Sequence, residues 1–337
     1  MNLATDYCGI ELSSPLVVGA SPLVDDLDVV KRLEDSGASA IVMRSLFQEQ
    51  IERESMNTFA QIEGHAHMSA EALSFFPDTD DYVLGPHNHI DQLAKLKAAV
   101  SIPVIASLNG TTPGGWLEYA KLMEDAGADA LELNFYELAA DFDRSGADIE
   151  NELVAIVEEL VRATTIPISV KLSPFWSSLP HLAKRLVAAG AKGLVLFNRF
   201  YQADIDVEAL EYENRLQLSH SRDLLLRLRA IAILRGRLDT SLICTGGAHT
   251  VPDLVKALMS GADAVQFVAA LLTRGPEHLK VLRDGLEIWM AEHGHESLEG
   301  LRGNMSLERC PDPHALLRGN YAQMLRSWTA DREGYYS

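Results

Sequence analysis

The sequence predicts a (β/α)8 barrel, a ring of eight parallel strands in which each strand is followed by a helix. One pattern, Gly-Ala and one further residue before a buried apolar run, occurs four times, at Gly37, Gly127, Gly190 and Gly261. Two other apolar runs open with Ile-Pro, at residues 102–103 and 166–167. Eight such units fill roughly 250 residues, the usual length of this fold.

The apolar runs give the positions of the strands. Each run is four to seven residues long, too short for a helix and bounded by turn residues. We expect strands over residues 14–20, 40–44, 104–108, 130–133, 168–173, 194–197, 242–245 and 264–268. The first run exits at residues 19–22 without a GxGxxG turn, which favours a barrel over a doubly wound sheet.

We expect one domain over residues 1–337, with two additions to the barrel. Residues 46–100 are too long for a turn and a helix, so we interpret them as an insertion over one barrel end that closes with a helix near residues 90–99. We expect residues 297–337 to form a C-terminal helical extension. The insertion holds two His-X-His pairs (His65 with His67, His87 with His89), but no carboxylate pattern completes a metal site, so no metal is expected.

Composition limits the partners. The net charge of −19 argues against nucleic acid and anionic membranes. No apolar run is long enough to span a bilayer, and residues 1–6 lack the basic and apolar regions of a signal peptide. The three cysteines, Cys8, Cys244 and Cys310, fit neither a metal nor a disulfide framework. We therefore expect a cytoplasmic protein that acts on a small molecule.

Polar residues and glycines gather at the strand exits, where the active sites of such barrels lie. The set is Ser21, Arg44, Ser45, Asn109, Asn134, Lys171, Ser173, Asn198, Arg199, Gly246, Gly247, Val268, Ala269 and Ala270. Any one of them alone could serve a loop or cap a helix. Together they suggest a ligand site rich in amides, hydroxyls and cations.

Lys171 is the most informative of these residues. It stands between Val170 and Leu172 in a strand expected to be buried on both faces, so its charge needs an anion. A cofactor or substrate could supply that anion, or the lysine could form a structural ion pair.

Two other features point to a ligand. Asn134 and Asn198 occupy equivalent exits, and an amide that both donates and accepts suits the edge of a heterocycle or a flavin ring, although capping is the alternative. Gly246-Gly247 and the helix start near Ala270 match the phosphate site common in such barrels, with a plain tight turn as the alternative.

From about residue 7 to 275 the chain resembles the FMN-dependent dihydroorotate dehydrogenases. The matched motifs are Ala20-Ser21, Glu132-Leu133-Asn134, Val170-Lys171-Leu172, Asn198, Thr245-Gly246-Gly247, and Val265-Gln266 followed by Ala270-Leu271. The resemblance implies FMN as cofactor, and a homodimer by family likeness.

The resemblance also implies roles for single residues. Ala20 and Ser21 would lie against the flavin, and Lys171 would stabilise negative charge on the reduced ring. Gly246, Gly247 and the backbone of Val268 and Ala269 would hold the phosphate. Arg44, Ser45 and Asn109 are further cofactor-binding candidates. Asn134 would bridge flavin and substrate, with Asn198 and Arg199 on the substrate.

The chain departs from the family after the fourth strand. Family members have a cysteine or serine base there, whereas this chain reads Asn134-Phe135-Tyr136-Glu137-Leu138 and has Glu137 at that position. Glu137 or Tyr136 could take the proton. The family's Asn-X-X-Gly-X-Pro-Asn run before the third strand is missing, and its Gly-Thr pair at the phosphate site becomes Val268-Ala269. The chain thus resembles a divergent branch.

We therefore expect an FMN-dependent oxidoreductase that passes a hydride between flavin N5 and a small anionic or heterocyclic substrate. The reference reaction is oxidation of dihydroorotate to orotate, a step of pyrimidine biosynthesis. Three alternatives remain: an FMN enzyme acting on another C=C or C=N bond, a flavin-free aldolase-type barrel with Lys171 as a Schiff-base amine, and a non-catalytic FMN-binding protein. The sequence leaves the electron acceptor open, since it has no NAD fingerprint and no cysteine set for an iron–sulfur centre.

Overall fold

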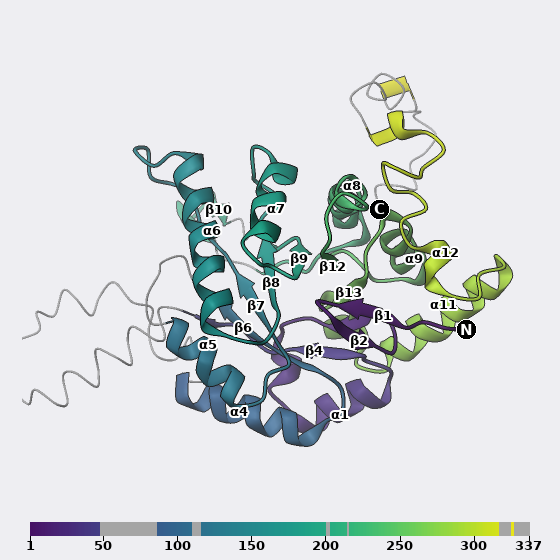
Figure 1. The fold of residues 1–337 in the computed structure, drawn as a ribbon, viewed down its shortest axis with the longest axis horizontal. Helices are drawn as coiled ribbons and strands as arrows, with labels where there is room; N and C mark the ends of the chain where they lie inside the picture. The colour runs from purple at the N-terminus through teal and green to yellow at the C-terminus, as the bar shows by residue number, and fades with distance from the viewer. Residues whose placement is uncertain (48–85, 110–115, 200–202, 214–215, 317–324, 327–337) are drawn as a thin grey trace, which may run out of the picture.

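A computed structural model describes residues 1–47, 86–109, 116–199, 203–213, 216–316 and 325–326. Its centre is a closed ring of eight parallel strands (Figure 1), which confirms the expected barrel and all eight expected strands. The ring closes where β4 pairs with β6 and where β13 pairs with β3. In chain order its strands are β3 Leu16–Val18, β4 Ala40–Val42, β6 Val104–Asn109, β7 Ala130–Asn134, β8 Ile168–Leu172, β9 Gly193–Leu196, β12 Ser241–Thr245 and β13 Ala264–Phe267.

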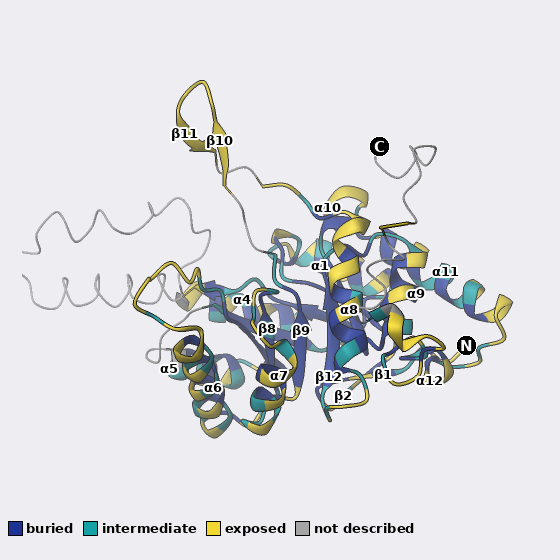
Figure 2. Cartoon of the chain, turned by 90° about the horizontal axis from the view of Figure 1, so that it is seen from above, coloured by how far each residue is buried: buried dark blue, intermediate teal, exposed yellow. Residues whose placement is uncertain are grey.

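Helices surround the ring, and the strands beneath them are buried (Figure 2). The longer helices are α1 Leu27–Asp35, α4 Pro86–Ala99, α5 Trp116–Asp125, α6 Gly146–Ala163, α7 Leu179–Ala188, α8 Leu224–Leu234, α9 Val251–Ser260 and α11 His278–Glu292. Shorter helical segments are η1 Pro22–Val24, η3 Ser221–Asp223, α10 Ala269–Arg274, α12 Leu298–Leu301 and η4 Pro313–Leu316. Strand side chains alternate, so that Leu131 and Leu133 pack in the helix-facing core while Glu132 points into the barrel.

The repeated Gly-Ala pattern has a backbone cause. Gly37, Gly127, Gly190 and Gly261 have φ angles of +102°, +95°, +106° and +120°. A residue in this region ends a helix and turns the chain, and glycine adopts it without a Cβ clash. Each glycine therefore stops a helix and redirects the chain into the next barrel strand.

A hairpin that sequence reasoning missed closes the N-terminal end of the barrel. Its strands are β1 Thr5–Tyr7 and β2 Ile10–Leu12. Tyr7 and Leu12 pack against inward residues of the ring such as Ile105 and Ala130. The backbone N–H of Cys8 donates to Ser241 Oγ over 2.8 Å, which ties the hairpin to β12. Among the described residues the hairpin therefore covers the N-terminal end of the barrel and leaves the C-terminal end for a cavity.

Two further strand pairings complete the described structure. β5 Leu46–Phe47 extends the sheet beside β6. Between β9 and α8 lies a second hairpin, β10 Asp204–Asp206 and β11 Glu211–Glu213. Within the expected insertion, α4 confirms the closing helix.

The remaining insertion residues, including His65 and His67, and most of the C-terminal extension lie outside the described residues. The division into one domain with these two additions stays a prediction. On α4, His87 is exposed and His89 is buried, so this pair does not face one site. The described residues hold no cluster of three metal-ligating side chains, and none of their helices is long and apolar enough to cross a membrane.

Candidate active site

A cavity of about 210 Å³ lies at the C-terminal mouth of the barrel. It brings together nine of the predicted site residues, from five different strand exits. They are Ala20, Ser21, Lys171, Asn198, Arg199, Gly246, Gly247, Val268 and Ala269. We call this space the mouth cavity. Its lining from β3, β8, β9, β12 and β13 is what the ring geometry predicts, because parallel strands end at the same rim.

The mouth cavity is cationic in an acidic protein. Lys171, Arg199 and Arg227 line it, and none of its described lining residues is aspartate or glutamate. Two lining side chains also hold a buried polar atom without a hydrogen-bond partner, Ser21 Oγ and Gln266 Oε1. Buried polar atoms are rarely left unpaired, so the cavity suits an anionic ligand that also carries hydrogen-bonding groups.

Lys171 contacts a fully buried carboxylate beneath the cavity. Its Nζ lies 3.2 Å from Glu132 Oε1, and Glu132 has no exposed surface. The other carboxylate oxygen of Glu132 accepts from Gln266 Nε2 over 2.6 Å. The ion-pair reading of Lys171 is therefore confirmed, and the same lysine also lines the cavity. Its Nζ stands between an internal anion and the ligand space.

Sequence reasoning treated Glu132 as part of a motif and gave it no role. The sequence pattern could have predicted a role for Glu132, because it lies between two leucines in a buried strand, as Lys171 lies between two apolar residues. Strand register completes the argument: Glu132 pairs with Ser169 and Asn134 pairs with Lys171 across β7 and β8. All four side chains thus face the barrel interior.

Tyr7 forms the floor below this ion pair. Its hydroxyl lies 3.4 Å from Ser169 Oγ. Burial, followed by the negative charge of Glu132, raises the pKa of Tyr7 well above its ordinary value. Tyr7 therefore stays neutral as a hydrogen-bonding group and adds no charge beneath the cavity.

Arg227 is a second residue that sequence reasoning missed. It comes from α8 and is buried, and its guanidinium donates to the carbonyl oxygens of Thr245 (3.0 Å) and Asp223 (2.6 Å). None of the described carboxylates forms an ion pair with it. Burial, together with the nearby charge of Arg199, lowers the pKa of Arg227. A buried arginine held by carbonyls alone keeps its charge available to a ligand at the mouth.

The glycine pair after β12 is shaped for a close approach. Gly246 and Gly247 have φ angles of +86° and +87°. A Cβ on Gly247 would lie 2.5 Å from the backbone nitrogen of Leu224. The N–H of Gly247 already donates to Ser219 Oγ over 3.2 Å. The first N–H groups of α10, which begins at Ala269, have no intrahelical acceptor and so remain for a ligand.

The other predicted cofactor residues lie outside the mouth cavity. Arg44 Nη1 pairs with Asp25 Oδ2 at 2.7 Å, and Ser45 Oγ lies 2.7 Å from Ser107 Oγ. Asn109 ends β6 in register with Asn134. Asn134 Oδ1 accepts from Asn198 Nδ2 over 2.6 Å, so Asn134 supports a cavity residue from behind.

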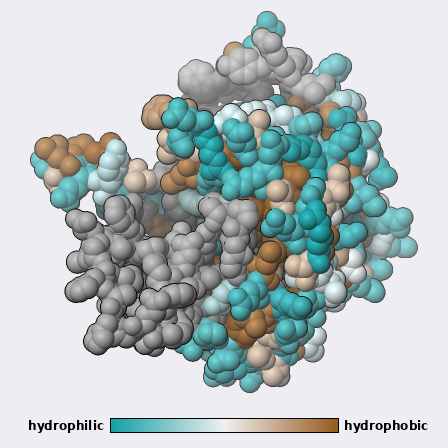
Figure 3. Space-filling view, turned by 60° about the vertical axis from the view of Figure 1, so that its left-hand side comes forward, coloured by the Kyte–Doolittle hydropathy of each residue, from teal (hydrophilic) through white to brown (hydrophobic). Residues whose placement is uncertain are grey.

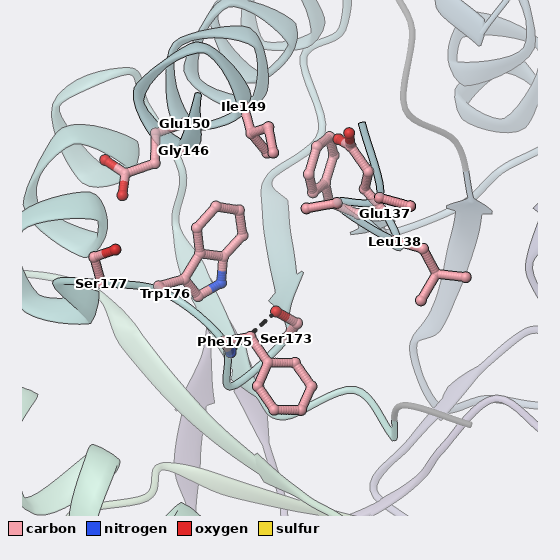
Figure 4. Close-up of a pocket in the computed structure, with 12 residues that line it drawn as sticks. Glu137, Leu138, Gly146, Ile149, Glu150, Ser173, Phe175, Trp176 and Ser177 are labelled. Carbon is pink, nitrogen blue, oxygen red and sulfur yellow. Dashed lines mark hydrogen bonds between the residues drawn. The ribbon is translucent and has the colours of Figure 1, made fainter. Parts of the chain in front are cut away.

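The predicted bases lie on the loop after β7, and Glu137 faces a separate cavity of about 380 Å³ (Figure 4). That cavity is larger than the mouth cavity but shares none of its described lining residues, and its walls include Phe135, Ile149 and Trp176. Glu137 pairs with Arg144, which also contacts Glu152. Tyr136, next in the chain, is half-buried.

The local environment sets the protonation of Glu137. Burial raises its pKa, the charge of Glu152 adds to this, and Arg144 opposes it. Glu137 Oε2 is buried without a hydrogen-bond partner, as is Trp176 Nε1 in the same wall. A carboxyl with a raised pKa holds a proton more readily than an ordinary glutamate, as a general acid or base requires, although Glu137 lines this cavity and not the mouth cavity.

Fold and site together define a class of protein: a (β/α)8 barrel that a hairpin closes at its N-terminal end and whose cationic mouth has no carboxylate among its described lining residues. A family model described as dihydroorotate dehydrogenase matches residues 2–290. The chain belongs to the dihydroorotate dehydrogenase family, and it is an oxidoreductase of that type.

Three relatives illustrate the range of the similarity. A putative dihydroorotate dehydrogenase A (fumarate) from Aeropyrum pernix is 32% identical over 217 residues, covering 63% of this chain and 70% of the relative. The catalytic subunit of dihydroorotate dehydrogenase B (NAD(+)) from Methanocaldococcus jannaschii is 24% identical over 294 residues, covering 86% and 94%. The NAD-dependent dihydropyrimidine dehydrogenase subunit PreA of Escherichia coli is 23% identical over 326 residues, covering 90% and 76%.

Proposed function

We propose that this protein is an FMN-dependent oxidoreductase that exchanges a hydride with a small anionic or heterocyclic substrate, with dihydroorotate as the first candidate. The observation that carries the proposal is the mouth cavity, which has three cations, no carboxylate among its described lining residues, and two unpaired buried polar atoms. FMN combines a phosphate with a ring that has both donors and acceptors, so the residues present fit it. When bound, FMN would supply the hydride acceptor.

The residues at the phosphate side would act by charge and by shape. Arg227 and the first N–H groups of α10 would hold the phosphate, and Gly246 and Gly247 would allow its close approach. On the opposite wall Lys171 would stabilise negative charge that develops on the ring, because its Nζ is fixed in place by Glu132. Ser21 and Gln266 would satisfy their free oxygen atoms with ring groups.

On the substrate side, Asn198 and Arg199 line the cavity and would bind the substrate, with Asn134 holding the Asn198 amide. The loop after β7 would supply the base, with Glu137 as first candidate and Tyr136 as second. In the described arrangement Glu137 faces the neighbouring cavity, so this role requires the loop to turn it toward the mouth. Cytoplasmic location, a role in pyrimidine biosynthesis and a homodimer belong to the same proposal.

The runner-up substrate is another dihydropyrimidine. Two observations favour it: Glu137 replaces the usual base, and one relative is named a dihydropyrimidine dehydrogenase subunit. The aldolase alternative gains no support, because Lys171 Nζ is engaged by Glu132 and the family match is to dehydrogenases.

The test is an absorbance spectrum of the purified protein, followed by anaerobic mixing with dihydroorotate and, separately, with dihydrouracil. We expect a flavin spectrum that is bleached by dihydroorotate. Bleaching by dihydrouracil alone would move the assignment to the runner-up. A protein that neither contains FMN nor takes it up would refute the proposal.

Matched variants locate the cofactor and the base. Lys171→Ala should weaken FMN binding or slow flavin reduction, whereas Lys192→Ala, which changes an exposed lysine just before β9, should change neither. Glu137→Gln should slow flavin reduction by roughly a hundredfold or more if Glu137 is the base. An unchanged rate in Glu137→Gln together with a slow Tyr136→Phe would assign the base to Tyr136.

A further inference from the structure

The hairpin of β10 and β11 stands away from the barrel (Figure 2). Every residue from 203 to 213 is exposed. Four of them are large and apolar: Ile205, Val207, Leu210 and Tyr212, with 59%, 73%, 85% and 76% of their surface exposed. The brown surface on this arm is visible where it projects at the left of Figure 3. Contiguous exposed apolar side chains of this kind mark an interaction site.

The strand register separates the arm into two chemically different faces. Asp204 lies opposite Glu213, and Asp206 lies opposite Glu211, so four carboxylates share one face. Ile205 lies opposite Tyr212 on the other face. Like charges directly opposite each other destabilise a strand pair, and an isolated two-stranded hairpin is at best marginally stable. Among the described residues none forms an ion pair with these carboxylates.

The turn, in contrast, is well specified. The carboxylate of Asp206 accepts from the N–H groups of Glu208 and Ala209, each over 2.9 Å. These bonds lower the pKa of Asp206 and keep it ionised. Leu210 adopts a φ of +57°, which few side chains tolerate. The sequence therefore fixes the shape of the arm while leaving both of its faces and both of its edges without a partner in the described chain.

We propose that this arm is a docking site for a protein partner, which contributes an extended segment in which basic and apolar residues alternate. Such a segment would pair with a free edge of β10 or β11 by main-chain hydrogen bonds. Its alternation would place basic side chains on the carboxylate face and apolar side chains beside Ile205 and Tyr212. One such segment would pair with the carboxylates, cover the apolar side chains and fill the free strand edge at the same time.

Charge complementarity disfavours the other occupants. Nucleic acid and anionic membranes are repelled by the carboxylate face, and a second copy of this chain has a net charge of −19. The chain's own residues 48–85 carry eight carboxylates against one arginine, so they do not complement the arm either. A basic partner remains as the occupant that the charges fit.

The position of the arm gives the docking a consequence. Residues 216–219, a short distance after β11 in the chain, line the mouth cavity. A partner held on the arm would therefore be attached, through a few residues of chain, to a wall of that cavity, whatever the cavity binds.

The test uses the full chain and a short fluorescein-labelled peptide that alternates lysine and valine, followed by fluorescence anisotropy. Native protein should bind it, and added salt should weaken binding. The variant with D204N, D206N, E211Q and E213Q should bind about tenfold more weakly, because several exposed ion pairs worth a few tenths of a kcal/mol each are lost. A peptide with its lysines and valines in separate blocks should bind less well than the alternating one.

A matched control separates the arm from net charge. E11Q, D125N, E292Q and E299Q remove four exposed carboxylates elsewhere and should leave binding unchanged. A second variant, I205T with Y212T, should weaken binding while keeping every charge. Equal binding by native protein and the arm variant, or an equal loss in the control, would overturn the proposal. So would sedimentation showing a native dimer that the arm variant converts to monomer, since the occupant would then be a second copy.

Discussion

The ion pair inside the barrel predicts an unequal response to loss of its two charges. Lys171→Met leaves the carboxylate of Glu132 fully buried, with Gln266, at 2.6 Å, as its remaining hydrogen-bond partner among the described residues. Removing one partner of a buried pair costs about 3–5 kcal/mol. Glu132→Gln should cost less, about 1–2 kcal/mol. A glutamine can still accept from Gln266, and Lys171, with 11% of its side chain exposed, lies at the cavity edge where water reaches it.

The double variant should be close in stability to Glu132→Gln alone, since a methionine at position 171 then faces a neutral amide. The coupling energy between the two sites would then equal the cost of Lys171→Met, about 3–5 kcal/mol. The assay is urea unfolding followed by tryptophan fluorescence. It is performed after removal of any bound flavin, because a ligand that binds the folded state adds its own stability.

A partly exposed ion pair elsewhere in the protein is the control for the buried pair. Lys97 Nζ lies 2.6 Å from Asp129, with about a quarter to a third of each side chain exposed, so Lys97→Met should cost less than about 1 kcal/mol. Two results would refute the reasoning: a Lys171→Met variant no less stable than Glu132→Gln, or additive effects in the double variant. Either result would mean that other groups in the barrel stabilise the buried charge of Glu132.

Three further predictions concern single residues. Gly247→Ala should lower the free energy of unfolding by about 2 kcal/mol or more, because its φ is positive and the new Cβ would lie 2.5 Å from the backbone nitrogen of Leu224. Gly9→Ala is the control, since Gly9 has a φ of +89° and a Cβ there would meet nothing within 4 Å. It measures the cost of the positive φ alone. Burial lowers the pKa of His89 from 6.5 to about 4. As the pH drops from 6.5 towards 4, His89 therefore takes up a proton in the unfolded chain but not in the folded one. The free energy of unfolding should fall by about 3 kcal/mol over this range. His89→Phe should flatten that part of a pH series of urea midpoints, and an unchanged slope would contradict the assignment. Burial raises the pKa of Cys244 to about 12, so a disulfide reagent should label this thiol in unfolded but not in native protein; fast native labelling would show that β12 is accessible.

The barrel could be predicted because its signals are local. Each Gly-Ala entry is a helix stop followed by a short buried strand, and the parallel ring then places every strand exit at one rim. That was enough to bring residues such as Ser21, Lys171 and Gly246 to one cavity without any knowledge of long-range contacts. Most of the candidate residues that line the mouth cavity could therefore be predicted from the strand exits.

The missed features depend on contacts that no local pattern contains. The hairpin at residues 5–12 is defined by packing on strands more than two hundred residues away, as in the contact between Cys8 and Ser241. Arg227 looks like one arginine of an apolar helix until α8 places it against Thr245. Glu137 was predicted as a candidate base from its position after β7, but the partner that holds it, Arg144, could not be identified from spacing alone.

The hairpin of β1 and β2 also bears on how the chain is made. Its residues are translated before the ring strands, yet the N–H of Cys8 donates to Ser241 on β12, and Thr5 donates to the carbonyl of Asp263 just before β13. During synthesis Tyr7 and Leu12 have no barrel to enter until nearly all eight ring strands have emerged. The hairpin is thus translated before the ring but is among the last parts of the barrel to reach its native place, and until then a chaperone would meet its exposed apolar side chains.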